Sequence, residues 1–407
     1  SYFNSFSATI GGGTCLLQHN IVGERVLGLP KSSGSKSMSN AICFSEEQAM
    51  LLDTAMDFCS THSPITSVRT RIEEESDFSD DLWRQVIDLG WTAIIIPESY
   101  AGLGLSMTDL VPIVESMGRN LMTTPLVSST LAAHALIEGG SEEQKNTWLP
   151  RIAQGAIATI ALAEAEGSWN LKQLTSSGTR INGKVQLSGS KNLVENAAAA
   201  DVILISINLE GEPVLALIEK SLIPDGALTR EIIIDETRRA YQLDLDGIII
   251  DESMLLASCC LKQIEYATLL LLCAEMAGGH AAVLNVIVEY LNTRKQFDRY
   301  IGSYQALKHP TVQILIDMEA SRSHLYHAAT IWNTATEDEL EIALRMAKAH
   351  ASESFAHAGD RAVQFHGGFG FTYECDAQLF LRRALWCQYQ FGDEKYHRQL
   401  LAPLLLD

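Results

Sequence analysis

Two short segments in the last third of the sequence combine residues that could bind an anionic ligand. The first, TRKQFDRYIGSYQALKH (293–309), carries Arg294, whose planar and permanently charged guanidinium suits a diphosphate. The second, AVQFHGGFGFTYE (362–374), contains Gly367 and Gly368, where a ligand can approach the backbone closely. Each segment alone also has an ordinary structural reading, as a solvated cation at a helix end and as a helix C-cap. Their chemistry therefore depends on the elements that position them.

The elements that position these residues follow an unusual order along the chain. Helical periodicity comes first, short alternating runs with turns such as Asn182-Gly183 follow, and long apolar helical patterns then continue to the end. We therefore expect an α+β protein with an N-terminal all-α domain, a middle β-domain and a C-terminal four-helix bundle. A leading segment rich in Ser and Gly is predicted to be an extension or an added leader. The predicted division is 1–37 (leader), 38–156 (α-helical domain), 157–257 (β-domain) and 258–407 (bundle).

Composition restricts the class of partner. The formal net charge of −20 would repel a phosphate backbone, so no nucleic acid is expected. The eight cysteines form no CxxC pair, which favours free thiols in a reducing compartment, the cytoplasm. The spacing of His350, His357 and His366 gives no i, i+4 metal pair, and no metal site is predicted. The most apolar stretch, Tyr266 to Ala274, is nine residues long, too short to predict a membrane span.

Four segments in this order resemble the acyl-CoA dehydrogenase family, over nearly the whole chain from about Phe44 to Leu404. GWTAIIIPESYAGLG (90–104) is similar to the glycine-rich stretch that ends the family's helical domain, and ETRRAYQLDLDGIIIDESMLL (236–256) to its last β-domain strands. The two anion-binding segments complete the match. The resemblance implies an acyl-CoA dehydrogenase-like fold, FAD as cofactor, an acyl-CoA thioester as substrate of α,β-dehydrogenation, and an oligomer.

The resemblance also assigns cofactor-binding residues. In the family, an Arg and a Phe three residues apart, a following Gln and a Q-x-x-G-G-x-G loop hold the diphosphate and adenosine end of an FAD bound mainly by the neighbouring subunit. The matching positions are Arg294, Phe297, Gln305, Gln364, Gly367 and Gly368. Asp298 stands where the family usually has Gly, and its charge near the diphosphate is expected to reduce affinity for FAD.

The positions that do chemistry in the family differ in this sequence. The Glu that acts as base in many members is matched by Phe391, and the Glu used in another branch is matched by Thr268. Neither side chain can accept the substrate proton. Positions that contact or cover the flavin ring are matched by Ala163, Leu193 and Glu195, and a carboxylate at the last of these opposes the negative charge of reduced flavin.

Residues that a subunit uses in its own active site are therefore changed, while those it lends to its neighbour remain. The favoured hypothesis is a subunit that clamps FAD for a homologous partner in a hetero-oligomer and has lost its own base. The resemblance associates such assemblies with fatty acid or steroid side-chain catabolism. The alternatives are an active homotetramer with a relocated base (Asp393 first, then Glu265 and Glu374) and a non-enzymatic scaffold.

An oligomer is also expected from the apolar runs Leu269 to Leu272 and VLNVIV at 283–288. These runs predict more apolar surface than one bundle core should bury.

Overall fold

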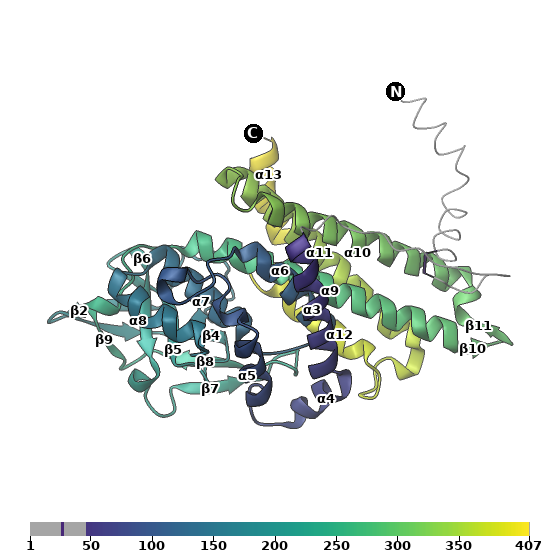
Figure 1. Ribbon diagram of the computed structural model, residues 1–407, viewed down its shortest axis with the longest axis horizontal. Helices are drawn as coiled ribbons and strands as arrows, with labels where there is room; N and C mark the ends of the chain where they lie inside the picture. The colour runs from purple at the N-terminus through teal and green to yellow at the C-terminus, as the bar shows by residue number, and fades with distance from the viewer. Residues whose placement is uncertain (1–25, 28–45, 407) are drawn as a thin grey trace.

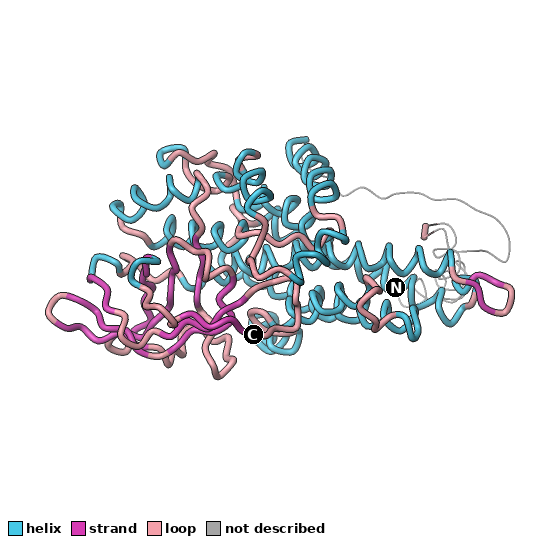
Figure 2. The backbone as a smooth tube through the Cα atoms, turned by 90° about the horizontal axis from the view of Figure 1, so that it is seen from below, coloured by secondary structure: helices cyan, strands magenta, loops and turns pink. Residues whose placement is uncertain are grey.

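The computed structural model describes residues 26–27 and 46–406, so the predicted leader 1–37 lies outside the described residues except for Val26 and Leu27. The strands gather at one end of the molecule, and the longest helices extend away from them toward the other end (Figures 1 and 2). The predicted fold class, an acyl-CoA dehydrogenase-like α+β fold of helices, then sheets, then a helical bundle, is confirmed.

The first part of the described chain is helical. Several of its helices begin at residues with good capping chemistry: the Ser141 hydroxyl accepts from the backbone N–H of Gln144, whose side chain in turn accepts from the Ser141 N–H. The α-helices are α3 (Glu46–His62), α4 (Ile65–Glu73), α5 (Asp80–Asp88), α6 (Val111–Arg119), α7 (Leu126–Gly139) and α8 (Glu142–Ala153).

Two sheets form the β-domain. One has the order β1-β5-β2-β3-β9 with β6 also paired to β5, and the other has the order β4-β8-β7. β5 is apolar and almost wholly buried because it lies between β1 and β6. The strands are β1 (Ala158–Ala161), β2 (Ser177–Ile181), β3 (Lys184–Ser188), β4 (Ser190–Glu195), β5 (Val202–Leu209), β6 (Glu212–Glu219), β7 (Leu228–Glu231), β8 (Ala240–Asp244) and β9 (Ile249–Asp251).

The C-terminal part is a bundle around α9, whose far end carries a small hairpin. By length and composition α9 could cross a membrane, with a mean hydropathy of 1.6 over its most apolar window, but 83% of that window is buried inside the protein. It is the core helix of the bundle. The elements are α9 (Leu261–Thr293), β10 (Lys295–Gln296), β11 (Arg299–Tyr300), α10 (Gln305–Ile331), α11 (Glu337–His366), α12 (Ala377–Tyr389) and α13 (Glu394–Leu406).

Helices α6 and α9 cross at glycines. A Cβ added at Gly118 would lie 2.1 Å from the Glu275 carbonyl oxygen, and one at Gly278 would lie 1.8 Å from that of Glu115. Only glycine permits this approach. The crossing brings α9 against the N-terminal helices and fixes the position of Glu275.

The apolar runs that suggested an oligomer are mostly inside the chain's own core. Leu269, Leu270 and Leu271 are buried, as are Val283, Leu284 and Ile287. These runs therefore leave little apolar surface for an oligomer interface, because helices enclose α9 on several sides. The oligomer that the resemblance implies is consistent with the oligomeric structures among the similar proteins.

Candidate functional site

A cavity lies where the N-terminal helices, the β-domain and the bundle meet. It is lined from α6, α7, β1, β4, α9 and the turn after α12, and about 90 Å³ of it is free. The structure brings five residues from distant segments together at this cavity. They are Ala163, Leu193, Glu195, Thr268 and Phe391, the positions matched by sequence to the family's flavin and base residues.

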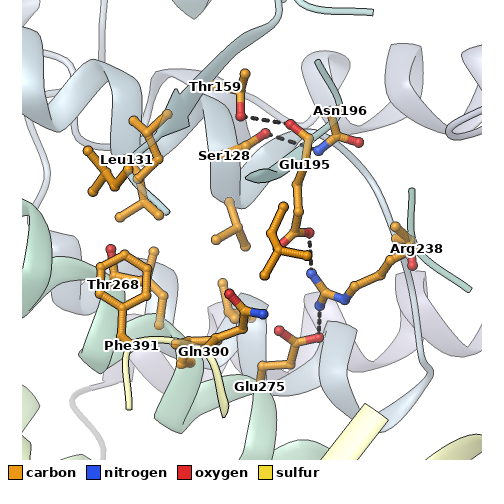
Figure 3. A pocket seen from close by; sticks show the side chains of 18 of the residues that line it. Ser128, Leu131, Thr159, Glu195, Asn196, Arg238, Thr268, Glu275, Gln390 and Phe391 are labelled. Carbon is orange, nitrogen blue, oxygen red and sulfur yellow. Dashed lines mark hydrogen bonds and ion pairs between the residues drawn. The ribbon is translucent and has the colours of Figure 1, made fainter. Parts of the chain in front are cut away.

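An ion-pair bridge crosses one side of the cavity. Arg238, in the turn before β8, donates to the Glu195 carboxylate at 2.5 Å and also to the carboxylate of Glu275 on α9. Figure 3 shows Arg238 reaching between these two carboxylates, with Phe391 and Thr268 across the cavity. Glu195 is thus not the bare carboxylate expected from the sequence, because its charge is compensated by a neighbouring guanidinium.

A second arginine supports this bridge from behind. Arg383 on α12 is fully buried and donates to Glu275 at 2.5 Å, to Thr237 Oγ1 at 2.7 Å and to the carboxylate of Asp235. Burial alone would raise the pKa values of Asp235 and Glu275, but the two arginines outweigh it and lower both. Asp235 and Glu275 therefore stay charged at neutral pH, and both carboxylates are held by arginines.

Aromatic side chains close another side of the cavity. The Phe391 ring is 8% exposed and stacks on Trp169, from the loop after β1, at a centroid distance of 4.6 Å and an interplanar angle of 19°. Thr268 donates its hydroxyl hydrogen to the Ile264 carbonyl at 2.7 Å, as helical threonines often do. Both positions matched to the family's base therefore have structural contacts in this chain.

The three carboxylates considered as relocated bases do not line the cavity. Asp393 Oδ1 accepts from the Tyr396 backbone N–H at 2.9 Å, which is a helix-capping contact at the start of α13. Glu265 pairs with Arg345 at 3.1 Å. Glu374 lies on the exposed loop before α12. Their assignment as bases stays a prediction that this arrangement does not favour.

The β-domain frame around the cavity keeps a buried ion pair. Lys191 Nζ donates to Glu164 Oε1 at 2.6 Å and to Ser206 Oγ at 3.1 Å. β4 then has an irregular register between Lys191 and Val194, where Leu193 adopts a φ of 55° and lines the cavity. The irregular register of β4 thus places the Leu193 side chain at the cavity.

A groove lies at the opposite end of α9. Its free volume of about 630 Å³ is larger than that of the cavity, and its lining includes Arg294, Gly367 and Gly368. Tyr290 and His366 also line it, and their ring centroids are 4.0 Å apart in a stacked arrangement. No carboxylate in the described part of the chain forms an ion pair with Arg294. A Cβ added at either glycine would meet no atom within 4 Å, so their backbone is open to a ligand.

The other predicted cofactor residues surround the groove without lining it. Gln305 and Gln364 are exposed, and Phe297 is 87% exposed at the tip of the β10–β11 hairpin. Phe297 and Asp298 form a two-residue turn in which both have positive φ, 53° and 59°. Such a turn favours Asn or Gly, so Phe297 is held exposed in a strained backbone conformation.

Cavity and groove are separated along α9. The lining residues of the two sites that lie nearest along this helix, Glu275 and Tyr290, are 15 residues apart, which is about 22 Å along a helix. Figure 1 shows the hairpin at the end of the bundle farthest from the β-domain.

The sequence did not predict three residues that line the cavity, Arg238, Glu275 and Trp169, or Arg383 behind them. One signal was available, because Glu275 interrupts an apolar helical run that must be buried. A buried carboxylate needs a cationic partner, and the pair Arg238-Arg239 was a candidate.

The chain thus defines an α–β–α protein with a cavity at the domain junction and an open groove lined by Arg294 at the end of the bundle. Residues 45–156 match the family model described as the acyl-CoA dehydrogenase N-terminal domain, and residues 268–406 match the C-terminal domain. The chain belongs to the acyl-CoA dehydrogenase family, whose members are FAD-dependent oxidoreductases that act on CH–CH bonds.

Similar proteins include the acyl-CoA dehydrogenase IpdE2 of Mycolicibacterium smegmatis, 28% identical over 342 residues that cover 84% of this chain and 93% of that protein. Among solved structures, a variant of the Tcur3481–Tcur3483 steroid ACAD is 25% identical with a TM-score of 0.80, covering 88% of this chain and 98% of the other. The ChsE4–ChsE5 complex of Mycobacterium tuberculosis has a TM-score of 0.82 at 23% identity, covering 90% and 99%.

Two further expectations concern cysteines and metals. The six cysteines in the described ranges are free thiols, and five of them are buried. Within residues 26–27 and 46–406, no three His, Cys, Asp or Glu side chains are arranged to hold a metal ion.

Proposed function

We propose that this chain is a cytoplasmic subunit of a hetero-oligomeric, FAD-dependent acyl-CoA dehydrogenase. It holds the diphosphate and adenosine end of an FAD for a homologous partner subunit and supplies no catalytic base itself. The observation that carries the proposal is the contrast between a cavity filled by the chain's own side chains and an open, cationic groove.

The cavity residues do not fit the isoalloxazine ring of FAD. The free volume of about 90 Å³ is smaller than the ~150 Å³ of an engineered cavity that binds one benzene. Flavin has three fused rings, so Phe391, Trp169 and the Arg238 bridge would all have to move. Moving Arg238 would remove the cationic partner of the half-buried Glu195 and one of the two cationic partners of the buried Glu275, which is costly for the latter.

The groove residues do fit the other end of the cofactor. Arg294 offers an unpaired guanidinium to a diphosphate, and Gly367 and Gly368 leave their backbone accessible. The exposed ring of Phe297 at the hairpin tip can cover an adenine. Arg294, Phe297, Gln305, Gln364, Gly367 and Gly368 are the proposed cofactor-binding set.

The substrate of the assembly is an acyl-CoA thioester, which undergoes α,β-dehydrogenation at the partner's active site. A bulky acyl group such as a steroid side chain is favoured, because the similar Tcur3481–Tcur3483 structure is named as a steroid ACAD. The two names in that description also favour a hetero-oligomer. The homotetramer alternative needs a base in the cavity, and the capping contact of Asp393 argues against it. The scaffold alternative leaves the open groove unexplained.

The test is the flavin content of the chain purified alone. We expect weak or no binding when FAD is titrated against the isolated chain and the flavin absorbance that survives gel filtration is measured. A stoichiometric flavin spectrum would refute the proposal. The FAD titration repeated with a co-expressed homologous subunit is the positive control, since the complex is expected to retain flavin.

A further inference from the structure

Lys348 on α11 is a fully buried lysine that forms no ion pair with any described carboxylate. Its three ammonium hydrogens are nevertheless all used. Nζ donates to Ser352 Oγ at 2.9 Å, to the Gln388 carbonyl at 3.0 Å and to the Gly392 carbonyl at 2.7 Å. A lysine has three donors, so the group is satisfied by one hydroxyl and two backbone oxygens.

The two carbonyls bracket Phe391, which has an unfavourable backbone conformation. Its φ is 57°, and that of the following Gly392 is 98°. A left-handed Phe persists only where its surroundings hold it in place. The hydrogen bonds from Lys348 on either side provide that restraint and fix the direction in which the ring points.

The partner ring is restrained from the opposite direction. Trp169 stacks on Phe391, and the Trp169 carbonyl accepts from the Tyr396 hydroxyl at 3.2 Å. The Tyr396 N–H donates to Asp393 Oδ1. A loop of the β-domain and the turn after α12 are thereby joined over the cavity.

We propose that Lys348 is a positioning residue that orients the side chain of residue 391 toward the cavity. The stacked Phe391–Trp169 pair is thereby held in place, and it determines which ligands can enter the cavity. The position matched to the family's base is then altered in chemistry but not in geometry. The inference rests on the proposed function only in naming flavin as the excluded ligand, because the restraint itself is a property of this chain.

The test places a reporter thiol at the position that Lys348 is inferred to aim. Phe391→Cys is made with Lys348 intact, with Lys348→Met and, as a matched control, with Lys395→Met, which removes an exposed lysine close to the same turn. Maleimide labelling of the introduced thiol is followed by peptide mass spectrometry. The buried Cys59, in the N-terminal domain, reports global unfolding in the same sample.

We expect Lys348→Met to accelerate labelling at position 391 about tenfold or more, because three charge-assisted hydrogen bonds are lost. Labelling of Cys59 and the Lys395→Met variant should stay unchanged. Equal rates at position 391, or parallel acceleration at Cys59, would overturn the inference.

If Lys348→Met does not fold, Lys348→Gln replaces it, since its amide can donate two of the three hydrogen bonds. An intermediate rate is then expected, and an unchanged rate overturns the inference. FAD binding by the unmodified chain would refute the proposed function but would leave the labelling rates at position 391 unaffected. Failure of the proposed function and failure of this inference are therefore distinguishable.

Discussion

The cavity lies beside the first half of α9 and the groove at its C-terminal end, and the two sites use their charged residues in opposite ways. At the cavity, the Arg238 and Arg383 side chains have little solvent access and pair with Glu195, Glu275 and Asp235 of the same chain. At the groove, Arg294 is exposed and forms no ion pair with a described residue. The first arrangement stabilises this chain, whereas the second is available to another molecule.

This difference separates arginines that stabilise the chain itself from an arginine that is available to bind another molecule. Buried arginines satisfied by several carboxylates cannot be released without leaving uncompensated charge. An exposed arginine beside open glycine backbone contributes little to stability and can therefore be used for binding. The comparison predicts that mutations at the cavity lower the stability of this chain, whereas mutations at the groove lower flavin retention and leave stability nearly unchanged.

The largest expected effect is on stability at the cavity end. Arg383→Met leaves the buried carboxylates of Asp235 and Glu275 with Arg238 as their shared cationic partner, which should cost about 3–5 kcal/mol. Arg294→Met, the matched change at the groove, should cost less than about 0.5 kcal/mol. Urea unfolding of both variants beside the parent chain measures these changes in the free energy of unfolding. Similar midpoints for the two variants would contradict the division between the two ends.

The second largest expected effect is a loss of FAD retention on mutation of the groove. Arg294→Ala should weaken FAD retention in the co-expressed complex roughly ten- to hundredfold, since a charge-assisted contact contributes about 1.5–3 kcal/mol. Gly368→Val should have a similar effect, because its side chain would enter space that is empty in the isolated chain. Flavin content per complex is the measurement.

The controls for this experiment are the unfolding midpoint of each isolated chain and the variant Arg84→Ala, which removes an exposed arginine of the N-terminal domain. All three isolated chains should be as stable as the parent. Full flavin occupancy in both groove variants would mean that the groove is only structural.

Much of this architecture could be predicted from the sequence, because periodicity and turn chemistry are local signals. The change from helical to alternating patterns near Ile157 and the return to helices near Lys262 agree with the observed elements. Arg294 and the Gly367-Gly368 pair could be assigned to one site because the motif spacing is specific.

The cavity bridge could not be predicted in the same way. Glu195, Arg238 and Glu275 come from β4, the turn before β8 and α9, and their pairing depends on how three separate elements pack. The role of Asp393 was hidden for a different reason. A carboxylate near a helix start can serve as a cap or as a base, and only the contact with Tyr396 N distinguishes the two.

The smallest effect that we expect is a pH dependence of stability contributed by His397. His397, on α13 beside the Lys348 turn, is fully buried, and its Nδ1 lies 3.4 Å from the Arg345 guanidinium. A guanidinium can only donate, so Nδ1 must remain unprotonated. Burial, reinforced by the charges of Lys348 and Arg345, lowers the pKa of His397 to about 3.

The unfolded chain protonates this histidine near pH 6.5 while the folded chain does not, so stability is lost as the pH falls below 6.5. Between pH 7 and pH 5.5 the loss attributable to His397 is about 1 kcal/mol. His397→Gln should remove that part of the slope, whereas His327→Gln, which removes an exposed histidine, should leave it intact. Urea unfolding at the two pH values measures the slopes, and hydrogen exchange should locate the acid-induced opening at the turn after α12. An unchanged slope in His397→Gln would show that this histidine is not held neutral in the folded chain.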